Sequence, residues 1–202
     1  CLHCWRPIEL TLGDKMSEID DPIEILNGIV EERRKLMMGF GGNDKVDKKE
    51  FKKALEPSLY TMSLSGEPTI YPRLGEMFAE IRRRGAVSFL VTNGLNPDAL
   101  RKLNETEFPT QITISTNAPN KELFLKWHKS TKKEAWELFN ESLDVLKSLE
   151  GKVRRVIRMT LVKEGNGGLT NMDEDNIKEY TKLIEKANPD FIHVKGFMSV
   201  GY

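Results

Sequence analysis

Cysteine, net charge and long hydrophobic runs are what this sequence has least of. Its 202 residues include only two cysteines, Cys1 and Cys4, so a fold held together by disulfides is excluded. Lysine plus arginine and aspartate plus glutamate each total 31, so a nucleic-acid partner would need a local basic patch. No run of about 18 apolar residues occurs, which argues against a membrane-spanning helix. We therefore expect a cytoplasmic protein with no membrane partner.

The apolar residues that are present indicate a folded domain. They make up 39% of the sequence and recur in blocks along it, which is not typical of a disordered chain. The length suits about one domain. The first residue is Cys1 rather than methionine, and residues 200–202 show no helix-stop signal or polar tail. We expect residues 1–202 to form one domain that is a fragment of a longer chain.

Helical and strand patterns alternate along the chain. Apolar residues at helical spacing predict helices that pack on a core, within residues 26–37, 74–81, 136–146 and 177–187. Asp21 followed by Pro22 resembles the start of the first helix. Runs rich in β-formers predict strands at residues 59–64, 87–92, 111–117, 155–162 and 191–195. Strands separated by helices indicate an α/β fold with a parallel sheet.

Polar residues occupy alternate positions in four of the predicted strands. They are Thr61 and Ser63, then Gln111, Thr113, Ser115 and Asn117, then Arg158 and Thr160, and finally His193 and Lys195. Strands of a parallel sheet are usually apolar on both faces. Two interpretations fit this pattern: the polar face lines a hydrated lumen that holds a large polar ligand, or it faces solvent in a half-exposed sheet.

The segment Cys1-Leu2-His3-Cys4 places two thiols close enough to bind one metal or one cluster. Zinc needs two further thiolate or imidazole ligands, and the sequence has only three histidines. A redox dithiol would follow a strand and open a helix, whereas the residues after Cys4 read as a loop. An iron–sulfur cluster with three protein ligands needs one more cysteine upstream. On these residues alone, a zinc half-site, a dithiol, a cluster loop and two unliganded cysteines remain open.

Three predicted strands end in turns rich in glycine and polar residues: Ser65-Gly66-Glu67-Pro68, Thr92-Asn93-Gly94 and Ser115-Thr116-Asn117. Each could be an ordinary turn. In α/β proteins, however, ligands bind at the carboxyl ends of the strands, where these turns would meet. Gly66 permits close backbone approach, and Glu67 offers a carboxylate to an ammonium group. We expect one ligand site along this rim.

Together these features resemble the radical S-adenosylmethionine (SAM) superfamily. Its members open with C-x-x-x-C-x-x-C, three cysteines that hold a 4Fe–4S cluster. Cys1 and Cys4 match the second and third, and the first lies outside this sequence. Ser65-Gly66-Glu67 resembles the G-G-E motif that meets the amino group of SAM, with serine in place of the first glycine. Taking the rim position of Asn93 with the resemblance, the expected SAM contacts are His3, Gly66, Glu67, Asn93, Ser115, Asn117 and Arg158.

Four longer blocks narrow the resemblance to the 4-demethylwyosine synthase family: C-x-x-C-W-R-P, S-G-E-P-T-I-Y-P, V-T-N-G-L-N-P and V-K-G-F-M-S-V-G-Y. This resemblance implies an incomplete (β/α)6 TIM-type barrel, here without its N-terminal segment and first strand. It implies condensation of 1-methylguanosine, beside the anticodon of tRNA-Phe, with pyruvate. The reaction would start from a 5′-deoxyadenosyl radical and would need an electron donor. The N-terminal segment outside this sequence is expected to hold a second cluster and a lysine that engages pyruvate.

Lysines are concentrated between residues 45 and 53, after the flexible run Gly39-Phe40-Gly41-Gly42. We expect a loop near the carboxyl rim that binds tRNA phosphates through Lys45, Lys48, Lys49, Lys52 and Lys53. A solvated helix face would show the same pattern. Residues 126–133 are a second basic candidate at the rim. Lys195 is expected to point inward at a strand end, where it is either catalytic or part of a solvated rim.

Two other functions remain open. Another radical SAM enzyme could act on a peptide or a small molecule, with no role for the lysine-rich segment. A non-enzymatic α/β domain could bind RNA without any cluster. Reconstitution with iron and sulfide would separate this domain from the enzymes.

Overall fold

The computed structural model describes residues 18–64, 66–163 and 168–198. Five parallel strands form one sheet in which sheet order equals chain order. The strands are β1 (Leu59–Met62), β2 (Val87–Thr92), β3 (Gln111–Ser115), β4 (Arg154–Leu161) and β5 (Phe191–Gly196). A parallel sheet without strand reversals is the arrangement of a TIM-type barrel that is not closed. The predicted α/β class and incomplete barrel are therefore confirmed.

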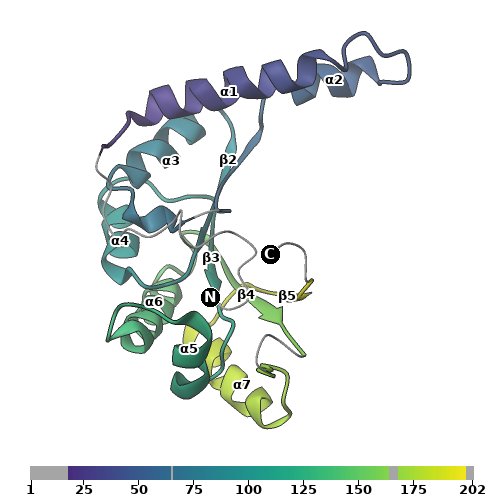
Figure 1. Cartoon of the computed structure of the whole chain (residues 1–202). Coiled ribbons are helices and arrows are strands. Elements are labelled where there is room, and N and C mark those ends of the chain that lie inside the picture. Colours follow the sequence, from purple (N-terminus) through teal and green to yellow (C-terminus); the bar gives the residue numbers. More distant parts are fainter. Residues whose placement is uncertain (1–17, 65, 164–167, 199–202) are drawn as a thin grey trace.

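Helices cover one face of this sheet (Figure 1). They are α1 (Pro22–Met38), α2 (Lys48–Ala54), α3 (Leu74–Arg83), α4 (Pro97–Lys102), α5 (Lys121–His128), α6 (Ala135–Ser148) and α7 (Asp175–Ala187), with short 3-10 turns η2 (Pro68–Ile70) and η3 (Leu103–Glu105). None of the helices in the described ranges is long and apolar enough to cross a membrane.

The core lies between the sheet and the helices. Leu90, Ile112 and Ile114 project from one face of β2 and β3 and are fully buried. From the helices, Phe78 of α3 and Phe139 of α6 are buried in the same cluster. Burying one such side chain contributes about 1.5–3 kcal/mol.

In β1, β3, β4 and β5 the alternation of side chains places Thr61, Ser115, Arg158 and His193 on the opposite face, as predicted. In β2, which was not among the four strands predicted to have a polar face, Ser88 and Thr92 share the buried face of Leu90.

In two helices, α1 and α7, some of the apolar residues predicted to pack on the core are exposed. In α1, Leu26 is fully buried, whereas Leu36 is 76% exposed and Ile29 is 42% exposed. In α7, Ile177 is 62% exposed. The expectation of core packing was wrong at these positions. For α1 the reason is geometric, because the helix extends past the edge of the sheet (Figure 1).

Two strands, β1 and β3, end two residues earlier than predicted. The chain leaves β1 at Met62, and Leu64 then adopts φ +91°, outside the extended region. At the end of β3, the backbone N–H of Thr116 still donates to the Arg158 carbonyl at 2.8 Å. The next hydrogen bond between these two segments involves a side chain: the Thr160 N–H donates to Asn117 Oδ1 at 3.0 Å. A side chain thus continues the ladder after the strand has ended.

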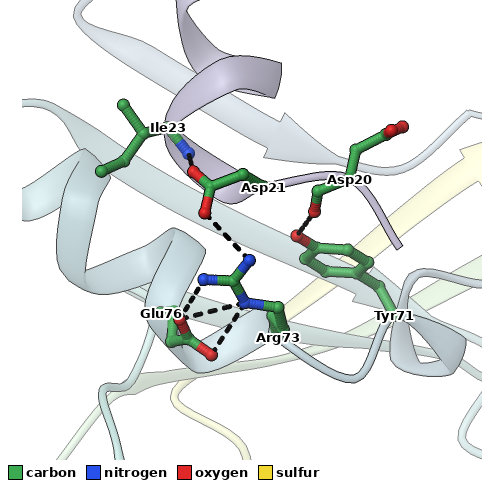
Figure 2. Close-up of polar contacts among 6 residues, drawn as sticks. All are labelled: Asp20, Asp21, Ile23, Tyr71, Arg73 and Glu76. Carbon is green, nitrogen blue, oxygen red and sulfur yellow. Dashed lines mark hydrogen bonds and ion pairs between the residues drawn. The ribbon is translucent and has the colours of Figure 1, made fainter. Parts of the chain in front are cut away.

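The start of α1 is fastened to the segment that follows β1 (Figure 2). Asp21 caps the helix by accepting from the Ile23 N–H at 2.8 Å. Its other oxygen accepts from Arg73 at 2.9 Å, and Arg73 also pairs with Glu76. The Tyr71 hydroxyl donates to the Asp20 carbonyl at 2.7 Å. These contacts fix the first turn of α1 beside the carboxyl end of the sheet.

Candidate active site

Polar side chains form rows across the carboxyl end of the inner sheet face, the face opposite the helices. The strand register pairs Ser115 with Arg158 and Arg158 with His193. One step further along, Thr160 pairs with Lys195. Register partners on parallel strands project to the same side. The structure therefore brings Ser115, Arg158 and Lys195 to one face, as the sequence predicted.

The carboxylate of Glu67 joins the end of β1 to the end of β2. Its Oε1 accepts from the Thr92 hydroxyl at 2.6 Å, from the Thr69 hydroxyl at 2.8 Å and from the Thr69 N–H at 3.2 Å. Its Oε2 accepts from the Asn93 N–H at 2.8 Å. Oε1 is therefore fully used, whereas Oε2 has capacity for a further donor. These bonds make Glu67 hold the ends of β1 and β2 together, and its Oε2 can accept one more hydrogen bond from a ligand.

The two other predicted residues of this corner shape the backbone. Asn93 Oδ1 accepts from the Leu95 N–H at 2.9 Å, which closes the turn after β2. Gly66 has φ +75° and is exposed, with no atom within 4 Å of where a Cβ would stand. Glycine is needed there for its conformation rather than for lack of space.

A buried amide clamp holds the ends of β3 and β4 together. Asn171 is 1% exposed, and its Nδ2 donates at 2.8 Å both to the Asn117 carbonyl and to the Thr160 carbonyl. Its Oδ1 accepts from the Val162 N–H at 2.7 Å. Sequence reasoning missed Asn171, because it lies 54 residues from Asn117 in a segment without a motif. Asn117, a predicted cofactor contact, is itself 5% exposed and held in place by this clamp.

Cationic groups dominate the next part of the rim. The Arg158 Nε is buried and has no hydrogen-bond acceptor within the described residues. Partial desolvation, and then the charge of Arg158, lower the pKa of the Lys195 ammonium. A buried donor without an acceptor costs free energy, so an anionic ligand that accepts from Arg158 would be favoured here.

The amino-acid part of SAM carries one ammonium and one carboxylate. Glu67 Oε2 offers an acceptor at the end of β1, and Arg158 on β4 offers an Nε donor that has no acceptor among the residues the structure describes. The hydroxyl groups of Thr113 and Ser115 lie on β3, which stands between β1 and β4 in the sheet. The donor and acceptor set of this rim therefore fits the cofactor that the sequence predicts.

The described part of the structure does not place every predicted residue at this rim. Cys1, His3 and Cys4, like Ser65, lie outside the described residues. Within the described ranges, no group of three or more histidine, cysteine or acidic residues could hold a metal ion. The lysines of residues 45–53 lie on and before α2, which precedes the amino end of β1. Two parts of the expectation for this segment, a loop near the carboxyl rim, were wrong. Residues Lys48–Ala54 form an exposed helix rather than a loop, and α1 carries the segment past the end of the sheet opposite the carboxyl rim (Figure 1).

In the second basic candidate, residues 126–133, two of the four lysines make internal contacts within the described part of the chain. Lys126 pairs with Glu122 at 2.7 Å, and Lys132 donates to the Leu95 carbonyl at 3.2 Å. The contact with Leu95 does place this segment beside the end of β2, at the carboxyl rim. This segment lies at the carboxyl rim as predicted, but it has fewer lysines without a side-chain contact in the described chain than residues 45–53 have.

Comparison with known proteins gives a consistent result. Among curated relatives, the S-adenosyl-L-methionine-dependent tRNA 4-demethylwyosine synthase of Pyrococcus abyssi is 39% identical over all of this chain and 57% of that protein. The synthase of Methanocaldococcus jannaschii is 35% identical over all of this chain and 62% of that protein. The chain thus spans about three fifths of the length of these archaeal relatives.

Solved structures agree with these sequences. The structure of TYW1 with a lysine-pyruvate adduct bound superposes on all of this chain and 61% of that one, with a TM-score of 0.81 and 34% identity. The crystal structure of archaeal TYW1 covers 90% of this chain and 58% of that one, with a TM-score of 0.74 and 35% identity. The model of the Radical SAM superfamily matches residues 1–168, more than half of the sequence. With its parallel sheet and polar carboxyl rim, this chain belongs to the radical SAM superfamily.

Proposed function

We propose that this chain is the radical SAM portion of a tRNA 4-demethylwyosine synthase. The enzyme would condense 1-methylguanosine, beside the anticodon of tRNA-Phe, with pyruvate to form 4-demethylwyosine. The observation that carries the proposal is the 39% identity to the Pyrococcus abyssi enzyme over the entire chain. The S-adenosyl-L-methionine-dependent tRNA 4-demethylwyosine synthase TYW1 of Homo sapiens is 32% identical over all of this chain.

Membership of the superfamily implies a 4Fe–4S cluster and SAM as cofactors. We assign two cluster ligands to Cys1 and Cys4, with the third cysteine and a second cluster in parts of the protein outside this sequence. When bound, the cluster and SAM would supply the 5′-deoxyadenosyl radical. The protein's own task is then to hold the reactants in position and to exclude water.

The rim residues divide this task. Glu67 would accept from the ammonium group of SAM through its free Oε2 capacity, while Gly66 permits the backbone turn beside it. Arg158 would donate to a carboxylate. Ser115 and Asn117 would contact the ribose, and Asn93 would hold the turn over the cofactor. His3 would lie near the adenine.

Lys195 is the proposed catalytic residue of this chain. Lys195 lies on the exposed β5 strand, in register with Thr160, where its ammonium group would be accessible to a negatively charged substrate. The solved relative carries a lysine-pyruvate adduct, which fits the lysine expected in the N-terminal segment outside this sequence, and Lys195 would act in addition to that lysine. We assign Lys195 a direct contact with the substrates on the inner face.

The implied partners are tRNA-Phe, pyruvate and an electron donor, with no role for a membrane. The competing candidates predict different results. A radical SAM enzyme for a peptide or small molecule would cleave SAM without modifying tRNA. A non-enzymatic RNA-binding domain would not hold a cluster after anaerobic reconstitution with iron and sulfide.

The test uses the full-length protein that contains this chain. After anaerobic reconstitution, we expect 4-demethylwyosine in tRNA-Phe that carries 1-methylguanosine, detected by mass spectrometry of the digested nucleosides. Cys4→Ala should abolish both product and SAM cleavage. Lys195→Met should abolish product while some SAM cleavage persists, and Lys182→Met on the exposed face of α7 is the matched control. Normal SAM cleavage by Cys4→Ala, or normal product from Lys195→Met, would contradict the respective assignment.

A further inference from the structure

The far half of α1, together with α2, forms an arm that leaves the domain (Figure 1). Near its start α1 is packed on α3, where Leu26 is fully buried and Asn27 accepts from Arg84 at 2.8 Å. At its end, Leu36 is 76% exposed and Met38 is 71% exposed. A helix of 17 residues is about 25 Å long. The arm therefore ends far from the carboxyl rim.

The arm has a defined internal structure. Arg33 Nε of α1 donates to the Ala54 carbonyl at the end of α2 at 2.6 Å, and Arg34 pairs with Glu56. In the connecting loop, Lys48 Nζ donates to the Gly41 carbonyl at 2.9 Å and to the Asn43 carbonyl at 3.3 Å. A docking element built in this way loses less conformational entropy on binding than an unstructured loop.

The five lysines of residues 45–53 fall into two groups. Lys48 holds the loop, and Lys53 pairs with Glu50 at 2.7 Å. Lys45, Lys49 and Lys52 make no ion pair within the described part of the chain. On α2, Lys49 and Lys52 are three residues apart and so share one side of the helix. Three cations at the arm are therefore available to a partner.

An exposed aromatic ring lies in the same loop. Phe40 is 52% exposed and stands between Gly39 and Gly41. Aromatic rings beside lysines are the combination that binds single-stranded nucleic acid, with the ring stacking on a base and the lysines on phosphates. Protein–protein interfaces, in contrast, are depleted in lysine. Leu36 and Met38 also expose apolar surface at the end of the arm, but three lysines without an ion pair in the described chain, near an exposed ring, favour RNA over a protein partner.

We infer that the end of the arm is a second tRNA contact, in which Phe40 stacks on an unpaired base and Lys45, Lys49 and Lys52 bind phosphates. The inference rests on the proposed function and extends it. The reacting nucleotide would lie at the carboxyl rim, whereas this contact lies past the amino end of β1. The arm would therefore bind a part of the RNA remote from the base that is modified.

The first test changes charge. In the full-length protein, Lys45, Lys49 and Lys52 are replaced together by glutamine, and tRNA binding is measured by filter retention over a range of salt concentrations. We expect weaker binding and a salt dependence flatter by about 0.7–0.9 per lost phosphate contact, or roughly 2 to 3 slope units for all three. The control variant replaces Lys147, Lys178 and Lys182, exposed lysines on α6 and α7, and should keep the original slope.

The second test changes the ring. Phe40→Ala should weaken tRNA binding by about tenfold, as expected for one lost base stack, and should leave the salt slope unchanged. Phe40→Trp should restore the affinity. Because Phe40 is half exposed, circular dichroism and thermal unfolding should match the wild type in both variants.

The outcomes separate the two proposals. SAM cleavage without tRNA should be normal in all arm variants, because the arm does not contact the rim. Wild-type binding with an unchanged slope in the triple variant would overturn the arm proposal alone. A Phe40→Ala variant that alters the oligomeric state, but not tRNA affinity, would also overturn it, since the arm would then be a protein interface. A wild-type protein that binds no tRNA would instead overturn the proposed function.

Discussion

The carboxyl rim and the arm are both rich in polar residues, but they use them in opposite ways. At the rim, Glu67 and Asn171 are buried or half-buried, and their side chains bond to groups on neighbouring strands. At the arm, Lys45, Lys49 and Lys52 have no such partner within the described residues. Buried polar groups that satisfy one another fix a geometry, whereas exposed charges contribute little to stability and stay available to a ligand. We therefore expect rim substitutions to change the fold or cofactor binding, and arm substitutions to change only RNA binding.

The largest effect on stability should come from breaking the amide clamp. Asn171→Leu keeps the approximate size of the side chain but leaves the Asn117 carbonyl, the Thr160 carbonyl and the Val162 N–H without this partner. Each lost buried bond costs about 1–3 kcal/mol, so a total of roughly 3 kcal/mol or more is expected. Urea unfolding measures the loss.

Lys49→Leu in the arm is the counterpart of this substitution and should shift the urea midpoint very little. If Asn171→Leu shifted the urea midpoint as little as Lys49→Leu does, the buried hydrogen bonds of the rim would not stabilise the fold more than the exposed lysines of the arm.

A smaller and more specific effect is expected at Glu67. Glu67→Gln replaces one carboxylate oxygen with an NH2 group. In one orientation of the amide this NH2 faces the N–H of Asn93, and in the other it faces the donors of Thr92 and Thr69, so a donor opposes a donor in either case. We expect SAM affinity to fall by about tenfold, and further in Glu67→Ala, because a charge-assisted contact contributes about 1.5–3 kcal/mol. Calorimetry on the reconstituted protein provides the dissociation constants.

Glu56→Gln at the base of the arm is the matched control, since the ion pair of Glu56 among the described residues is with exposed Arg34. Unchanged SAM affinity in Glu67→Ala would remove Glu67 from the cofactor site and leave it a structural tie.

The smallest expected effect concerns ion pairs and depends on pH. Hydrogen bonds from Arg83 and Arg84 lower the pKa of Glu80 from 4.5 to about 2. Because the folded-state pKa is the lower one, the contribution of Glu80 is present above pH 4.5 and is lost as the pH falls towards 2. Glu80→Gln should therefore be less stable than the wild type at pH 7, with a difference that disappears in acid.

Glu50→Gln removes an ion pair of the arm in which both partners are exposed, so it should have little effect at any pH. Urea midpoints measured from pH 7 down to pH 2 test both variants. A constant difference between Glu80→Gln and wild type over this range would contradict the assignment.

The sequence predicted the sheet well because strand faces follow a period of two. Ser115, Arg158 and Lys195 could be placed on one face from their positions alone, and the register confirms that placement. Asn171 could not be found in this way, because its partners are 9 to 54 residues distant and no local pattern marks it. The arm was misplaced for a related reason. A lysine-rich segment after a helix reads the same whether the helix ends at the sheet or, as α1 does, continues past it.

The helix α1 also connects the two regions as a single rod. Its first turn is bonded near the carboxyl rim through Asp21 and Arg73, and its far half forms the arm together with α2 (Figures 1 and 2). Because an α-helix rises 1.5 Å for each residue, the number of residues in α1 sets the spacing between the two ends. One turn added to α1 would therefore move the end of the arm by about 5.4 Å along a bound RNA. The length of α1 would then determine which nucleotide the arm reaches when the modified base is in place.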